Sequence, residues 1–299
     1  VVDELREKGL LKLDQGAQIV DLSEYKMPPC IILRSDGATL YATRDIAAAL
    51  YRKDTYDFAK CLYVVAYQQD LHFRQWFKVV ELLGYPWAKD LIHVSFGMVS
   101  GTEGAFSTRK GNMVKLRDVL SAACEKTLAI IEEKSPGLED KETVAKQVGV
   151  GAVVWSSLYN GRIKDVVFDW DAILNFDGET GPYAQYTHAR ACSVLRKAEY
   201  VPAASIDYSV LTDAESAAVI ASISAFPDSV QEAMEKNEPY LVSRAVIAVA
   251  SAFNKFYYEQ RIMADDKAVR TARLALTDAT RSVIAIGLGL LGLSAPERM

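Results

Sequence analysis

The sequence predicts an α/β domain followed by an all-α bundle, and two observations carry this prediction. In the first part, the apolar run "KCLYVVAY" (60–67), typical of a buried parallel strand, precedes the helical pattern "DLHFRQWFKVVELLG" and the next strand, "LIHVSFGMV". Such strand–helix–strand alternation indicates a parallel sheet. In the second part, after the Pro/Gly- and charge-rich break "EKSPGLEDKE", strand signals almost vanish. We therefore expect one domain over 1–135 and a helical domain over 136–299.

The first part begins with a predicted hairpin. "PPCIILRSDGATLYAT" predicts short strands at Cys30–Leu33 and Thr39–Ala42, because the Ser-Asp-Gly between them is favourable turn chemistry. "TRDIAAALYR" then predicts a helix, with Thr43 as its N-cap and three alanines as strong helix formers. The helix that follows Asp70 is expected to end at Gly84, a typical C-cap residue.

Five helices are expected in the second part from the 3–4 spacing of its apolar residues. They cover 142–163, 181–199, 212–236, 238–262 and 266–292. Pro182 suits the first turn of its helix, and Asp265 and Asp266 suit an acidic helix start. One expected buried face consists of Val242, Val246, Val249 and Phe253. These patterns predict an all-α bundle.

Composition limits the possible functions. Half of the 299 residues are hydrophobic and 24% are charged, as in ordinary globular proteins. The four cysteines lie at least 31 positions apart, which suits reduced thiols in a cytoplasmic protein. The longest apolar run, Val283–Leu293, is too short to cross a bilayer, so we expect no membrane partner.

Charge is unevenly distributed along the chain. Residues 1–135 carry 18 basic and 18 acidic side chains, whereas the remainder carries 16 basic and 21 acidic ones. The remainder is therefore net acidic, whereas a protein that binds nucleic acid nonspecifically normally carries a net positive charge. If RNA binds to this chain, a restricted surface must hold it.

Common catalytic constellations are missing from the sequence. It contains neither a G-x-x-x-x-G-K-[ST] or G-x-G-x-x-G phosphate loop nor a G-x-S-x-G elbow. The three histidines, His72, His93 and His188, stand in dissimilar contexts. We therefore interpret them as structural, and we expect no metal site.

One polar stretch, "GAFSTRKGNMVKL" (104–116), offers a different chemistry. It closely follows the strand "LIHVSFGMV", and ligands of open α/β sheets bind beyond the carboxyl ends of strands. Its donors and cations suit phosphoryl or adenylyl transfer, whose transition state spreads negative charge over phosphate oxygens. The residues concerned are Ser107, Thr108, Arg109 and Lys110. On local pattern alone, a surface turn remains the alternative.

Five blocks occur in an order that closely resembles arginyl-tRNA synthetases, which are class I aminoacyl-tRNA synthetases. They are "DGATLYATRDIAAALYR", "YVVAYQQDLHFRQWFKVVELLGY", "FSTRKGNMVKLRDVL", "FDWDAILNFDGETGPYAQYTHAR" and the terminal "PERM". The resemblance spans essentially the whole chain. It implies the second half of a Rossmann-type nucleotide-binding domain, followed by an α-helical anticodon-binding bundle.

The resemblance implies that the polar stretch is a pyrophosphate-binding loop. Residues 105–109 resemble the class I KMSKS loop, in which Ala105 and Thr108 stand where the consensus has lysines. Arg109 and Lys110 are the cations left to contact pyrophosphate, and which of them does so stays open.

The resemblance also implies an arginine site, since Tyr41, Asp45 and Gln69 match positions that hold the substrate in relatives. A carboxylate such as that of Asp45 is the natural bidentate partner of a planar guanidinium, and a fixed fork separates arginine from lysine. The alternatives are an acidic first-turn residue for Asp45 and a strand aromatic for Tyr41.

In the second part, Tyr183, Tyr186 and Arg190 lie at i, i+3 and i+7, on one helical face. The resemblance, with Tyr257 as a further matching tyrosine, implies that this face binds tRNA. Rings can stack on unpaired bases while the guanidinium meets phosphate. Aromatics at this spacing can instead belong to a core, and for Tyr257 that alternative stays open.

The second class I signature, a HIGH-like block, does not occur in the sequence. The resemblance therefore implies the C-terminal part of a longer enzyme, which activates L-arginine with ATP and Mg²⁺ as substrates and transfers it to tRNA(Arg). We expect a monomer without a tightly bound cofactor, and no aminoacylation by the 299-residue chain alone. The alternatives are a non-catalytic RNA-binding or regulatory protein derived from a synthetase, and a class I synthetase for another amino acid.

Overall fold

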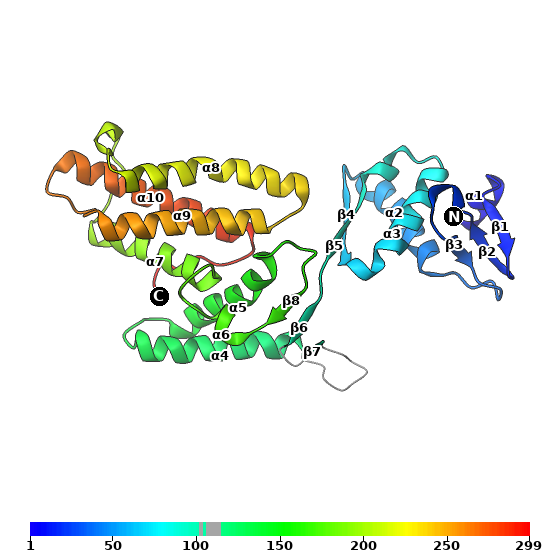
Figure 1. Ribbon diagram of the computed structural model, residues 1–299, viewed down its shortest axis with the longest axis horizontal. Coiled ribbons are helices and arrows are strands. Elements are labelled where there is room, and N and C mark those ends of the chain that lie inside the picture. Colours follow the sequence, from blue (N-terminus) through cyan, green and yellow to red (C-terminus); the bar gives the residue numbers. More distant parts are fainter. Residues whose placement is uncertain (102–103, 106–114) are drawn as a thin grey trace. The chain divides into compact units, whose positions relative to one another are not determined.

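The computed structural model describes residues 1–101, 104–105 and 115–299. The chain divides into two compact units, Val1–Met98 and Val99–Met299, which are described one after the other (Figure 1). Strands and helices alternate in the first unit and helices dominate the second, as the sequence predicts.

The first unit combines a small antiparallel sheet with a parallel strand pair. Its elements are α1 (Val2–Glu7), β1 (Leu11–Asp14), β2 (Ala17–Val20), η1 (Ser23–Tyr25), β3 (Cys30–Leu33), α2 (Tyr41–Tyr56), β4 (Cys61–Ala66), η2 (Tyr67–Gln69), α3 (Asp70–Leu82), η3 (Pro86–Asp90) and β5 (Leu91–Phe96). The antiparallel sheet has the order β1-β2-β3. Gln15 and Gly16 join β1 to β2, and both have a positive φ (47° and 83°), which a two-residue hairpin turn requires.

The predicted strand–helix–strand unit is confirmed. β4 and β5 pair in parallel, with Cys61 opposite Leu91, and α3 connects them. The helix ends just before Gly84, whose φ is 86° and whose N–H donates to the carbonyl of Glu81. This is the left-handed conformation that favours glycine after a helix.

The prediction of a second hairpin strand at Thr39–Ala42 is wrong. Its first residue makes an isolated bridge to Leu33, and α2 already begins at Tyr41. Thr43, the predicted N-cap, is instead the third residue of α2, and its buried hydroxyl donates to the carbonyl of Ile32 at 2.5 Å. Because the preceding strand satisfies this hydroxyl, the threonine joins α2 to β3 instead of capping the helix.

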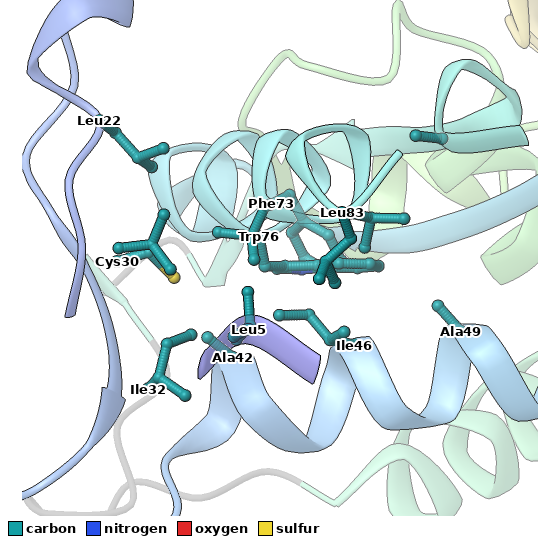
Figure 2. Close-up of a cluster of buried hydrophobic side chains, with 14 of the residues drawn as sticks. Leu5, Leu22, Cys30, Ile32, Ala42, Ile46, Ala49, Phe73, Trp76 and Leu83 are labelled. Carbon is teal, nitrogen blue, oxygen red and sulfur yellow. The ribbon is translucent and has the colours of Figure 1, made fainter. Parts of the chain in front are cut away.

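The core of the first unit lies between α2, α3 and the small sheet (Figure 2). Figure 2 shows Trp76 of α3 and Ile46 of α2 pointing toward one another, and both side chains are fully buried. Leu5 of α1 joins the same cluster. Burying a large apolar side chain contributes about 1.5–3 kcal/mol, so this cluster holds α2 and α3 together.

The second unit begins with a short sheet and continues as helices. Its elements are β6 (Val99–Gly101), β7 (Gly104–Ala105), α4 (Leu116–Lys134), α5 (Lys141–Leu158), β8 (Val166–Phe168), α6 (Trp170–Ile173), α7 (Gly181–Lys197), η5 (Tyr208–Val210), α8 (Ala214–Lys236), α9 (Tyr240–Glu259) and α10 (Lys267–Leu290). The strand order is β7-β6-β8, and β6 pairs with β8 in parallel. α5, α7, α8, α9 and α10 confirm the five predicted helices to within a few residues.

The helix starts and the buried face of the bundle also agree with the sequence. Asp266 caps α10 by accepting bonds from two backbone N–H groups, and Pro182 lies in the first turn of α7. The four predicted core residues of α9 are all buried. No helix in the described part of the chain combines the length and apolarity that a bilayer crossing needs.

The segment that follows α10 runs back to α7 and is anchored there. Gln185, His188 and Arg196 donate from α7 to carbonyl oxygens of residues 294–297, at 2.8, 3.0 and 3.0 Å. Three side chains of one helix thus fix this segment beside the surface that carries Tyr186 and Arg190.

Candidate functional site

Two of the three predicted arginine-binding residues lie on α2. Tyr41 is its first residue and Asp45 follows one turn later, so both are on one helical face. Tyr41 is 78% exposed, and the Asp45 side chain is 39% exposed. A ligand can therefore reach both side chains.

The third residue, Gln69, belongs to the short turn between β4 and α3. It lies beyond the carboxyl end of a parallel strand, which is where ligands of open α/β sheets bind. His72, in the first turn of α3, places its Nε2 2.7 Å from Oδ2 of Asp45. Asp45 therefore lies against the start of α3, the helix that directly follows Gln69.

Sequence reasoning did not assign His72 to this site. It interpreted all three histidines as structural, although His72 stands only three residues after Gln69. That spacing is the signal from which His72 could have been found.

The predicted pyrophosphate-binding residues lie outside the described part of the chain. They are Ser107, Thr108, Arg109 and Lys110. Among the residues that the structure describes, no group of three or more His, Cys, Asp or Glu side chains could hold a metal ion.

In the second unit, Tyr186, Arg190 and Tyr257 come together at the surface. The Arg190 guanidinium lies 4.8 Å from the ring centroid of Tyr186 on α7 and 5.1 Å from that of Tyr257 on α9. The two tyrosines are 41% and 42% exposed. A cation held between two half-exposed rings suits contact with phosphate and unstacked bases.

Asn254 holds this cation in place. Its side-chain oxygen accepts a hydrogen bond from Arg190, and its amide donates to the Thr187 hydroxyl at 2.8 Å. The sequence analysis missed Asn254, although it lies three residues before Tyr257 on the same face of α9.

Tyr183 is placed differently from its three predicted companions. It is half-buried and packs against the bundle core, and its hydroxyl lies 3.4 Å from that of Ser251. The structure therefore brings Tyr186, Arg190 and Tyr257 into one group, with Tyr183 one helical turn further into the bundle.

A cavity of about 510 Å³ adjoins the group of Tyr186, Arg190 and Tyr257. Its charged lining consists of Arg190, Arg196, Lys197, Arg298, Glu139 and Glu297. Cations therefore outnumber acidic side chains here, although residues 136–299 as a whole are acidic. This local excess of cations makes the lining of the cavity a candidate for the restricted surface that would hold RNA.

Two family models match the chain. The model described as "tRNA synthetases class I (R), catalytic domain" matches residues 1–170, which is more than half of the chain. The model described as "DALR anticodon binding domain" matches residues 184–299. The first match contains the candidate arginine site, and the second contains Tyr186, Arg190 and Tyr257.

Curated relatives and solved structures point the same way. Proteins named arginine–tRNA ligase from Clostridioides difficile and Halothermothrix orenii are each 56% identical to this chain over 299 residues. The match covers all of this chain and 53% of each relative, so the chain spans about half the length of the curated relatives it matches. The Thermus thermophilus arginyl-tRNA synthetase structure matches with a TM-score of 0.90 at 27% identity, over 100% of this chain and 57% of that one. Together with the catalytic-domain match, this shows that the chain belongs to the class I arginyl-tRNA synthetase family.

Proposed function

We propose that the chain forms part of a longer arginine–tRNA ligase, which activates L-arginine with ATP and transfers it to tRNA(Arg). The observation that carries this proposal is the accessible Asp45 carboxylate, which shares a helical face with Tyr41 and lies against the start of α3. A carboxylate in an open site can bind the guanidinium of arginine through two parallel hydrogen bonds. Tyr41 and Gln69 complete the proposed site.

In the proposed reaction, the carboxylate of arginine attacks the α-phosphate of ATP in line and pyrophosphate leaves. A hydroxyl of the terminal ribose of tRNA then attacks the carbonyl carbon of the arginyl-adenylate, its bond to phosphate breaks, and AMP leaves with the electron pair. We assign Ser107, Thr108, Arg109 and Lys110 to pyrophosphate, because hydroxyls and cations stabilise the negative charge that develops there. Mg²⁺ that accompanies ATP would neutralise phosphate charge, and we assign no residue of this chain to it.

We assign tRNA binding to the face that carries Tyr186, Arg190 and Tyr257, with Tyr183 supporting it from the bundle side. The exposed rings offer stacking surfaces for unpaired bases, which contribute about 1–3 kcal/mol per base. The adjoining cavity and its excess of cations support this assignment.

Exposed apolar side chains on β4 support the view that another part of the enzyme packs on the first unit. Tyr63 packs inward against the rings of Phe73 and Trp76, whereas Leu62 and Val64, on the opposite face, are 48% and 65% exposed. Parallel sheets are normally buried on both faces. We therefore propose that another part of the enzyme covers this face and completes the active site.

The proposal predicts that the purified 299-residue chain makes no arginyl-tRNA, whereas the full-length protein that contains it does. Charging of tRNA(Arg) with radiolabelled arginine measures both. Charging by the isolated chain above trace level would contradict the proposed division of the site, and no charging by the full-length protein would contradict the proposed activity.

The tyrosine–arginine group also favours a second candidate, a non-catalytic RNA-binding or regulatory protein derived from a synthetase. This candidate predicts a full-length protein that binds tRNA and does not charge it. The gene upstream of Val1 separates the two: an in-frame HIGH-like block supports the enzyme, and a start codon near Val1 without such a block supports the alternative.

The functional boundary at residues 135 and 136 stays a prediction. The compact units meet at Met98 and Val99, and we propose that residues 99–135 nevertheless serve the catalytic chemistry, because the segment with Arg109 and Lys110 lies within them. The monomeric state and the cytoplasmic location also stay predictions.

A further inference from the structure

His72 contacts the candidate arginine-binding carboxylate directly. Its Nε2 lies 2.7 Å from Oδ2 of Asp45, and the two side chains come from different helices, α3 and α2. The terminal torsion of an aspartate side chain has broad preferences, so an unrestrained carboxylate can turn. The bond from His72 fixes the plane of this carboxylate.

The imidazole ring of His72 is itself supported by the parallel strands. It meets Phe73 edge-on, with ring centroids 5.5 Å apart, and Phe73 stacks on His93 at 4.1 Å. His93 is anchored at both ring nitrogens, to Asp70 at 3.0 Å and to the carbonyl of Val65 at 3.0 Å. Two packed rings therefore connect His72 to β4 and β5.

The contact leaves Asp45 able to bind a ligand. A carboxylate offers about four lone-pair positions on its two oxygens, and His72 uses one of them. Oδ1 and the second lone pair of Oδ2 can therefore accept hydrogen bonds from two N–H groups of a guanidinium. Because the guanidinium is a rigid planar fork, its binding depends on the orientation of the carboxylate plane more than the binding of an ammonium does.

We propose that His72 is a positioning residue, which holds the Asp45 carboxylate in the plane that receives a guanidinium through two hydrogen bonds. His72 then contributes to the affinity for arginine without touching the reacting atoms. This inference rests on the proposed role of Asp45 as the arginine ligand.

Two substitutions in the full-length protein test the inference. His72→Leu removes the donor, whereas His72→Gln places an amide N–H near the position of Nε2. In steady-state aminoacylation, His72→Leu should raise the KM for arginine about tenfold, the effect expected from losing a hydrogen bond to a charged group. The kcat and the KM for ATP should change less than about twofold, because the contact orients only the arginine ligand. His72→Gln should restore most of the affinity for arginine.

Glu81→Gln is the matched control, since Glu81 lies in the last turn of α3 and its side chain is 61% exposed. This variant should leave every constant unchanged. If His72→Leu lowers the melting temperature, His72→Asn replaces it, because its shorter amide falls short of the Nε2 position, and the same rise in KM is expected. An unchanged KM for arginine in the folded variant that lacks the donor overturns the inference.

Asp45→Asn separates this inference from the proposed function. An unchanged KM for arginine in Asp45→Asn overturns the role of Asp45 itself. A raised KM there, together with an unchanged KM in His72→Leu, overturns only the role of His72. The double variant should match Asp45→Asn alone, because His72 acts through Asp45, and a further rise in the double variant contradicts that coupling.

Discussion

Arg190 is held from three sides, by the rings of Tyr186 and Tyr257 and by the side-chain oxygen of Asn254. A cation over an aromatic ring gains about 0.5–1 kcal/mol at an exposed site, and a hydrogen bond to a charged group contributes about 1.5–3 kcal/mol. A side chain that is already ordered loses less entropy when it binds a ligand. We therefore expect the guanidinium to be preorganised for RNA.

Asn254→Ala should weaken tRNA binding by the full-length protein about threefold to tenfold, because it frees Arg190 without removing its charge. Fluorescence anisotropy with labelled tRNA(Arg) at fixed ionic strength measures the Kd. Gln231→Ala is the matched control, since it removes an exposed amide of α8 outside this network. Equal affinities for the two variants would contradict a positioning role for Asn254.

We expect His188 to make the stability of the second unit depend on pH. Burial lowers the pKa of His188 from its usual 6.5. The Pro296 carbonyl, which accepts a hydrogen bond from Nδ1–H, raises this pKa by a smaller amount. Of the two charged groups nearby, Arg281 lowers the pKa and Glu297 raises it. Because the folded pKa is below the unfolded one, the unfolded state binds the proton first, and stability falls as the pH drops below about 6.5. The urea midpoint should therefore be lower near pH 5.5 than near pH 7.5, with a smaller difference in His188→Gln. Equal differences in the two proteins would exclude His188 as the cause.

The family resemblance was needed to identify Asp45 and Arg190 as candidates, and neither it nor residue type and spacing identified the side chains that hold them. His72 lies 27 residues from Asp45, and Asn254 lies 64 residues from Arg190. Each contact exists only because two helices pack side by side. Such partners follow from tertiary packing, which a local pattern does not contain.

At the scale of single elements, α9 and α10 approach closely at Gly287. A Cβ added there would collide with Cγ2 of Val246 and lie 3.2 Å from the ring of Phe226, whereas a Cβ at Gly289, in the same helix, meets nothing within 4 Å. Gly287→Ala should therefore destabilise the unit by about 1–3 kcal/mol through overpacking. Gly289→Ala should be neutral or stabilise it by up to about 1 kcal/mol, since alanine favours helices.

Thermal unfolding of the two alanine variants, side by side with the parent chain, measures this difference. A melting temperature for Gly287→Ala at or above that of Gly289→Ala would contradict this prediction. It would show that α9 and α10 can move apart at Gly287 without a loss of stability.

The periodic helices of the bundle were predictable because each buries a continuous apolar face, such as that of α9. The elements that the sequence analysis missed lack such a signal. β8 has only three residues and forms by pairing with β6, more than 60 positions earlier. α4 buries only Ala123, Thr127 and Ile131, so its apolar face is narrow and partly polar. Thr43 illustrates the same limit, since its bond to β3 outweighs its preference for the N-cap.

At the scale of the whole molecule, overall charge and local charge have opposite signs where RNA binding is proposed. Residues 136–299 carry an acidic excess, yet the cavity beside Tyr186 and Tyr257 is lined by more cations than acidic side chains. This distribution favours binding of one RNA site over general attraction to nucleic acid. The exposed face of β4 and the coverage of about half of each relative agree with our proposal that the candidate arginine site belongs to a longer protein.

The most direct test of this account is ATP–pyrophosphate exchange by the full-length protein, measured with tRNA and a panel of amino acids that includes arginine and lysine. A carboxylate such as that of Asp45 can bind a planar guanidinium through two parallel hydrogen bonds, a geometry that the compact ammonium of lysine does not match. The account predicts exchange that depends on arginine and is at background with lysine. Exchange supported by another amino acid, and not by arginine, would contradict it.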